Sequence, residues 1–290
     1  MNEERKQQYF AELAPKYDKL TGNTTQDIFV KFLDSYGPKL KITSSSIIHD
    51  NASGPGTATQ ILVKQAATRG TSPTIIATDY VPGMIETLNT IKATQTPSNP
   101  AWNNVTTNIC NSDDLSSYPD SHFTHSISNF SLFTITNAVK SLSETRRTLK
   151  PEGTASVLLW KRYAVQQLLA MAQNHIKGSG YAAKNAVSVN GPQYFQREVV
   201  PDQLIEAGFD REKIETWQMD HIVTNTGEDK EKWEGLYQFI FSTSVAAGST
   251  RGWSEEESAR WNEAVSWAME EERKTYGGLK FEAWISVARK

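Results

Sequence analysis

The chain has 290 residues, of which 38% are hydrophobic and 22% are charged, and its formal net charge is -3. This length suits one α/β domain with an insertion, or two small domains, and it can bury a large core. The small negative charge and the scattered basic residues argue against nucleic acid or an anionic membrane as a partner. The single cysteine, Cys110, excludes an intrachain disulfide and a cysteine-based zinc site.

The N-terminal part of the chain is predicted to be helical. Apolar side chains recur at helical spacing from Tyr9 to Leu20 and again from Ile28 to Tyr36, and Pro15 is expected to interrupt the first run. The charged start lacks the apolar stretch of a secretion signal, and no apolar run approaches ~20 residues. We therefore expect a cytoplasmic protein without a transmembrane helix.

Residues 46–160 alternate between strand-like and helix-like stretches. This alternation with short connections is typical of a parallel, doubly wound sheet, which binds ligands beyond the carboxyl ends of its strands. The predicted strands are 47–51, 74–79, 105–109, 123–129 and 154–161, and the predicted helices between them are 57–67, 83–93 and 138–149.

A glycine-rich turn follows the first predicted strand. Asp50 lies near the end of that strand, and Gly54-Pro55-Gly56 precedes the predicted helix. Glycines let a ligand approach the backbone closely, and the N–H groups at a helix start favour the anionic part of a ligand. Asp79 ends the next strand, where a carboxylate can accept hydrogen bonds from both hydroxyls of a ribose.

Beyond residue 161 longer helical stretches dominate. Helices are predicted over 164–176, 201–209, 229–247 and 254–276, and strands over 214–224 and 280–288. The many aromatic residues here suit either an apolar pocket for a hydrophobic or aromatic compound, or the core of a helical insertion. Trp160 and Tyr163 are the favoured pocket residues because they lie at the carboxyl end of the fifth predicted strand.

Four segments, in this order, resemble the motifs of class I S-adenosylmethionine (SAM) dependent methyltransferases that act on small molecules. They are similar to the family's D-x-G-x-G-x-G loop, the acidic loop after the second strand, the adenine-side loop, and the L-K-P-G-G turn before the fifth strand. The four segments are residues 50–56, 79–84, 111–123 and 148–154.

The resemblance implies a Rossmann-like, doubly wound, mostly parallel seven-stranded sheet with N-terminal helices and a helical insertion before the last strand. It implies SAM as cofactor, an N-terminal helical lid over residues 1–45, and a SAM-binding domain over 46–290 whose helical segments at about 163–210 and 226–278 cover the substrate. The cofactor-binding residues that it implies are Tyr17, Asp50, Asn51, Ala52, Gly54, Gly56, Asp79, Tyr80, Met84, Asn111, Ser112, Asp113 and Asn129.

Three positions depart from the family's pattern. Ala52 stands for the first glycine of the loop, Asn111 for a common aspartate, and Glu152 for a glycine of the L-K-P turn. These changes indicate a divergent branch. They leave open a protein that binds SAM without transferring the methyl group, as a cyclase-like catalyst or a regulatory partner.

Methyl transfer requires a nucleophile held near the methyl carbon, exclusion of water, and a base only when the nucleophile carries a proton. Among the histidines, His175 is the candidate catalytic base because its predicted helix follows the fifth strand. Phe133, Trp160 and Tyr163 are expected to contact the substrate. No His, Asp or Glu cluster has metal-ligand spacing, so no metal is expected.

The sequence therefore predicts a SAM-dependent methyltransferase that acts on an oxygen, nitrogen or sulfur nucleophile of a small, aromatic or hydrophobic secondary metabolite. We expect small-molecule partners, no nucleic acid or membrane, and a monomer or homodimer. The alternative is the SAM-binding protein that does not methylate. An NAD-dependent oxidoreductase is disfavoured because the glycine-rich loop reads D-x-A-x-G-P-G over residues 50–56.

Overall fold

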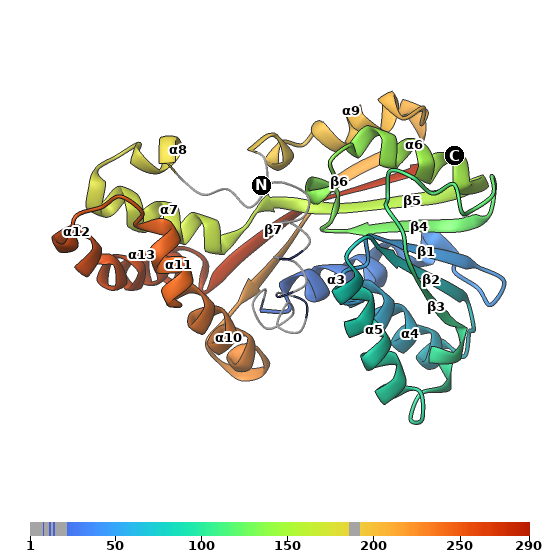
Figure 1. The fold of residues 1–290 in the computed structure, drawn as a ribbon, viewed down its shortest axis with the longest axis horizontal. Helices are drawn as coiled ribbons and strands as arrows, with labels where there is room; N and C mark the ends of the chain where they lie inside the picture. The colour runs from blue at the N-terminus through green and yellow to red at the C-terminus, as the bar shows by residue number, and fades with distance from the viewer. Residues whose placement is uncertain (1–7, 9–11, 13, 15–21, 186–191) are drawn as a thin grey trace.

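The computed structural model of the chain describes residues 8, 12, 14, 22–185 and 192–290. Its strands form one seven-stranded sheet in the order β3-β2-β1-β4-β5-β7-β6 (Figure 1). The strands are β1 Ile47–Asn51, β2 Thr74–Asp79, β3 Val105–Ile109, β4 Phe123–Asn129, β5 Leu149–Arg162, β6 Ile214–Val223 and β7 Leu279–Arg289. β1 to β5 pair in parallel, whereas β7 is antiparallel to both β5 and β6. The predicted seven-stranded, mostly parallel sheet is confirmed.

The fifth strand begins at Leu149, not at the predicted Thr154, and its register against β4 shifts within this segment. Glu152 adopts a left-handed conformation there, with a φ of 63°. A Cβ atom on Gly153 would lie 2.8 Å from the carbonyl oxygen of Lys150. The L-K-P-E-G turn is therefore an irregularity inside the strand, not a loop before it.

Helices cover both faces of the sheet. α3 Thr24–Leu40, α4 Thr57–Arg69 and α5 Pro82–Gln95 lie on one face, and α6 Ala138–Thr148 and α9 Val199–Glu206 lie on the other (Figure 1). The central strands β1 and β4 are consequently buried on both sides, as expected for a doubly wound sheet.

The remaining helices form a group beyond the carboxyl end of β5 (Figure 1). Two long helices predicted in this group are each divided. The first breaks at Ser242, whose hydroxyl accepts the N–H of Val245, and the second breaks at Arg260. The group comprises α7 Ala164–Lys177, α8 Tyr181–Asn185, α10 Lys230–Ile240, α11 Thr243–Ser249, α12 Glu255–Ala259 and α13 Trp261–Tyr276.

One apolar core joins the sheet to this helical group. Phe281 and Ile285 of β7, Leu168 of α7 and Val265 of α13 are all fully buried in it. The helical group therefore packs as an extension of the sheet domain rather than as a separate body. Among the described helices, none is long and apolar enough to span a membrane.

Candidate functional site: a cavity at the strand ends

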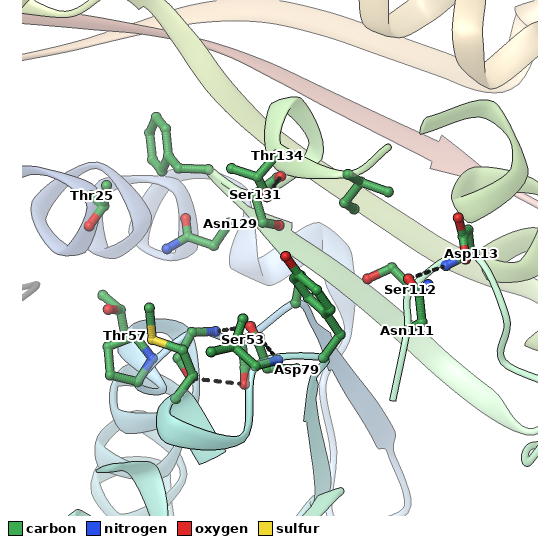
Figure 2. Close-up of a pocket in the computed structure, with 18 of the residues that line it drawn as sticks. Thr25, Ser53, Thr57, Asp79, Asn111, Ser112, Asp113, Asn129, Ser131 and Thr134 are labelled. Atoms are coloured by element: carbon green, nitrogen blue, oxygen red, sulfur yellow. Dashed lines mark hydrogen bonds between the residues drawn. The ribbon is translucent and has the colours of Figure 1, made fainter. Parts of the chain in front are cut away.

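A cavity of about 410 Å³ lies at the carboxyl ends of β1, β2 and β4. This is the position at which a doubly wound sheet binds its ligands. Polar side chains are spaced along the length of the cavity. Figure 2 shows Thr25, Thr57 and Asn129 at one end, Ser53 and Asp79 between, and Asn111, Ser112 and Asp113 at the other end.

The turn between β1 and α4 forms one wall of the cavity. Ala52, Gly54 and Gly56 all have positive φ angles, of 55°, 55° and 90°. A Cβ atom on Gly56 would lie 2.3 Å from the Cδ1 atom of Leu88, so only glycine fits at that position. Ala52 and Gly54 line the cavity, whereas Gly56 shapes the turn from behind it.

Asp50 and Asn51 do not line the cavity. The Oδ2 atom of Asp50 accepts the N–H of Thr59 at 3.0 Å and its hydroxyl at 2.6 Å. Burial raises the pKa of Asp50 to about 6, against the opposing effect of these hydrogen bonds. The Asn51 side chain is buried towards Thr145 of α6. The first turn of α4 thus already binds an acidic group of the chain itself, the carboxylate of Asp50. We had expected this carboxylate to face the ligand.

Asp79 lies at the middle of the cavity and links the loop after β1 to the segment after β2. Its Oδ2 atom accepts the N–H of Gly54 at 2.8 Å, and its Oδ1 atom accepts the N–H of Val81 at 2.9 Å. Burial raises the pKa of this carboxyl group, although these backbone hydrogen bonds favour its charged form. Each carboxylate oxygen keeps a further lone pair, so Asp79 can also accept a hydroxyl of a ligand.

The loop after β3 forms the far end of the cavity. Asn111, Ser112 and Asp113 line it, together with Tyr80 and Met84 from the segment after β2. The N–H of Asp113 donates to Oδ1 of Asn111 at 3.3 Å, which turns the loop at Ser112. The structure brings these five predicted residues to one cavity, and their contact with a cofactor stays a prediction.

The segment after β4 forms the wall opposite this loop. Asn129 was predicted, but Phe130, Ser131 and Thr134 were not, and all four line the cavity. Phe130 has a φ of 55°, which is strained for a bulky side chain. Its N–H donates to the carbonyl of Leu158 at 2.9 Å, which holds the loop against β5.

The sequence analysis also missed cavity residues that come from the starts of helices. Thr25, in the first turn of α3, and Thr57, the first residue of α4, both line the cavity. A threonine at a helix start gives no signal by itself, because it is equally common as a local capping residue. The predicted Tyr17 lies outside the described residues.

The residues predicted for substrate binding and catalysis do not line the cavity. Trp160 is buried, with its ring centroid 4.1 Å from that of Phe130 and 5.3 Å from that of Tyr163. Phe133 packs against the apolar core. His175 is exposed on α7 and stacks on Trp267 at 4.2 Å. Trp160 therefore supports the cavity wall through Phe130, and nothing in the cavity's geometry assigns a catalytic role to His175.

The cavity's charges are few and negative. Of the described residues that line it, Asp79 and Asp113 are acidic and none is a lysine, arginine or histidine. The described residues also contain no group of three or more His, Cys, Asp or Glu side chains that could hold a metal ion. The volume and the few negative charges of the cavity suit an uncharged or partly cationic, polar ligand of nucleoside size.

The family model of a methyltransferase domain matches residues 49–157. Over this range, which is less than half of the chain, the sequence is similar to the methyltransferase domain family. The matched range contains the end of β1, all of β2, β3 and β4, and most of the cavity's lining. SAM is the cofactor of the class I family, and the cavity fits it: a carboxylate lies at the centre, and the polar loop 111–113 lies at one end.

One known protein is similar to part of this chain in sequence, and two solved structures are similar to it in fold. A methyltransferase of Acremonium sp, ucsB, is 31% identical over 127 residues, which are 42% of this chain and 44% of that protein. The match thus spans less than half of that relative. A candidate methyltransferase of Bacillus halodurans has the same fold, with a TM-score of 0.53 at 12% identity, over 89% of this chain and 98% of that one. The cyclase SpnF also shares it, with a TM-score of 0.50 at 16% identity, over 89% and 80% of the two chains.

Proposed function

We propose that the protein is a SAM-dependent methyltransferase that acts on a small organic acceptor. The order of polar groups along the cavity is the observation that carries this proposal. The loop 111–113 suits an adenine, Asp79 suits the ribose hydroxyls, and the end near Asn129 is left for the amino-acid part. An extended adenosyl cofactor needs these groups in this order.

The side chains that line the cavity indicate which class of acceptor the protein would methylate. When bound, SAM supplies a methyl group on a sulfonium sulfur, which a nucleophile attacks in line. The cavity's described residues offer no histidine, lysine or arginine as a base. The chain would therefore act by binding, orientation and exclusion of water. We propose acceptors that are already nucleophilic at neutral pH, such as thiolates, amines or acidic phenols.

The side chains around Phe130 support an apolar or aromatic acceptor. Phe130 lines the cavity and packs on Trp160, and Ser131 and Thr134 line the same cavity. A flat, hydrophobic molecule with a few polar groups fits such a wall. A small, aromatic or hydrophobic secondary metabolite would have this chemistry, and the resemblance to small-molecule methyltransferases also supports such an acceptor.

Calorimetry with SAM, S-adenosylhomocysteine and NAD tests the proposal. We expect the first two to bind and NAD not to bind. Incubation with methyl-labelled SAM and a panel of thiols, amines and phenols should then label at least one acceptor. A folded protein that binds neither SAM nor S-adenosylhomocysteine contradicts the proposal, and binding without transfer to any acceptor favours the non-methylating alternative.

Asp79→Asn gives a residue-level test of the same proposal. Asparagine keeps one carbonyl oxygen, so one of the two backbone N–H donors loses its acceptor, and the negative charge that strengthens a bond from ribose is removed. We expect S-adenosylhomocysteine to bind about 10-fold more weakly or worse. Asp34→Asn, on the exposed side of α3, removes the same charge away from the cavity and should leave affinity unchanged.

A further inference from the structure

A second, much smaller cavity lies between the sheet and α6. Its volume is about 10 Å³, and residues of β1, β4, β5 and α6 enclose it. The interface around it is apolar, with Leu132, Leu142 and Val157 in contact with the cavity. Polar groups are nevertheless gathered at this one point, and all the polar residues that line the cavity are buried: Asn51, Ser126, Ser128, Ser141, Thr145 and Ser156.

The folded chain satisfies only part of the amide group of Asn51. Its Nδ2 atom donates to the hydroxyl of Thr145 over a long 3.4 Å, whereas its Oδ1 atom is shielded from bulk water and has no partner among the described residues. Buried oxygens of this kind are rare, because burial without a hydrogen bond destabilises the folded state. Since Asn51 lines the small cavity, a molecule inside the cavity is the partner within reach.

The size and charge of the cavity identify this molecule as water. A polar cavity of about 10–15 Å³ holds a single water molecule, which makes about three hydrogen bonds to groups that otherwise lack a partner. An organic ligand is too large for this space. None of the described residues that line the cavity is acidic, basic or a histidine, so nothing there would compensate the charge of a buried ion.

We infer that this cavity binds one structural water molecule, which joins α6 to the ends of β1 and β4. The water donates to Oδ1 of Asn51, and the hydroxyls of Ser141 on α6 and Ser128 on β4 complete its hydrogen bonds. Ser128 already shares a 2.8 Å hydrogen bond with Ser131, but a hydroxyl group can donate one bond and accept two.

The water site lies directly behind the larger cavity at the strand ends. Ala52 follows Asn51 and lines that cavity, and Ser131 lines it from the segment after β4. The hydroxyl of Ser131 donates to the carbonyl oxygen of Asn51 at 3.4 Å. The water therefore connects α6 to both of these loops. This role accounts for an amide at position 51 whose side chain does not line the larger cavity.

A double-mutant cycle tests whether Asn51 and Ser141 bind the same water molecule. Asn51→Leu removes the amide at similar volume, and Ser141→Ala removes the hydroxyl from α6. Each variant should lower the melting temperature by several degrees, although alanine has the higher helix propensity. The double variant should lose clearly less than the sum of the two single losses, because the second change acts on a water that the first has already released.

The same helix provides a matched control. Ser143 lies outside the small cavity, and its hydroxyl donates to the carbonyl of Val139 at 2.9 Å. The effect of Ser143→Ala on the melting temperature should simply add to that of Asn51→Leu.

A crystal structure that resolves ordered water locates the occupant directly. We expect one water peak in the wild-type cavity, within hydrogen-bond distance of Oδ1 of Asn51 and of at least one hydroxyl group. The peak should be missing in Asn51→Leu. Because the wild-type structure alone can decide the question, the test does not depend on whether a variant folds.

Three outcomes overturn the inference. A wild-type crystal structure without a water peak in the cavity removes the occupant. A dry cavity reverses the sign of the thermal effect, because Asn51→Leu would then remove an unpaired oxygen and would melt at the wild-type temperature or above it. Fully additive losses in Asn51→Leu and Ser141→Ala would show that the two residues bind nothing in common. None of these measurements involves a cofactor, so the inference and the proposed function stand or fail separately.

Discussion

Among single residues, Asp50 shows how a motif residue can serve the fold while its neighbours serve the ligand. The residue is 1% exposed and bound to Thr59 at the start of α4. Burial is the main reason that its pKa rises from 3.8 to about 6, and the charge of Asp79 adds to it. Near neutral pH the carboxylate is ionised at some cost to the folded state.

This pKa predicts a pH-dependent stability. An acid whose pKa is higher in the folded state contributes stability that is complete below pH 3.8 and is lost as the pH rises through about 6. Between pH 5 and pH 7.5, the free energy of unfolding of the wild type should therefore fall by about 1 kcal/mol more than that of Asp50→Asn. Urea titrations of both proteins at the two pH values, without ligand, measure this difference.

The exposed residue Asp34 supplies the control for that measurement. Asp34→Asn removes an equal charge on the solvent side of α3 and should follow the wild-type pH dependence. A wild type and an Asp50→Asn variant that lose stability in parallel between the two pH values would show that Asp50 is ionised in the folded protein well below pH 6.

The sequence could locate the cavity but not every residue that lines it. Asp79 and the loop 111–113 were found because each follows a strand, and strand ends meet at one edge of the sheet. Asp50 follows the same rule, yet its side chain points into the start of α4. Thr25 comes from a separate helix whose docking depends on the whole fold, and Phe130 depends on a strained φ that no local pattern encodes.

Among the elements, α3 and α10 are coupled across the sheet edge. Nζ of Lys232 lies 2.8 and 2.7 Å from the two carboxylate oxygens of Asp27, and His221 of β6 lies 3.0 Å from the same group. Gly22 packs so closely on α10 that a Cβ atom there would lie 2.5 Å from Cγ of Leu236. Thr25 lies between these two contacts, so α10 sets where the first turn of α3 meets the cavity.

Lys232→Met tests this coupling. Burial alone would raise the pKa of Asp27, but the hydrogen bonds from Lys232 and the nearby His221 hold it below its usual value. Removing the lysine leaves a partly buried carboxylate with less compensation, and we expect a loss of about 1–3 kcal/mol in unfolding free energy. S-adenosylhomocysteine should also bind several-fold more weakly by calorimetry, because the start of α3 is no longer held.

The same helix offers a matched control for this variant. Lys230 is exposed on α10, so Lys230→Met removes one lysine without touching Asp27. It should change neither the stability nor the affinity by more than the error of the measurement. Destabilisation by Lys232→Met with unaltered affinity would show that the ion pair stabilises the fold without positioning the cavity.

Helices and strands were predicted well where a single hydrophobic periodicity runs through the whole segment. The strands β1, β2, β3 and β4 begin and end as expected, because each is a short run bounded by turn residues. The stretches 229–247 and 254–276 were predicted as single helices because their apolar spacing continues through the breaks. Side-chain capping at Ser242 ends one of them, and such local competition is hard to see in a periodic pattern.

In the whole molecule, the cavity lies between the sheet and segments that are not part of the alternating core. Ala14, near the N-terminus, is 3% exposed and packs with Val81 and Met84 at the cavity's edge. Thr25 of α3 closes one end, and α10 holds α3 in place through Lys232. Segments from the N-terminal part of the chain and from the helical group after β6 are thus connected to one cavity.

This connection predicts that ligand binding stabilises the outer segments. The expected cover of the cavity includes the N-terminal segment 1–45 and the segment at about 226–278, and such segments exclude water from a reacting centre. When SAM and an acceptor bind, backbone amide exchange should slow several-fold in α10 and in the first turns of α3. A bound ligand adds contacts to the start of α3, and Lys232 transmits this stabilisation to α10. Peptides from α9, on the opposite face of the sheet, provide an internal control that should not change (Figure 1).

Lys232→Met should abolish the slowing in α10 while preserving it in the loops that line the cavity. Unchanged exchange in both α3 and α10, under conditions where calorimetry shows the cofactor bound, would leave the cavity with no lid among the described segments.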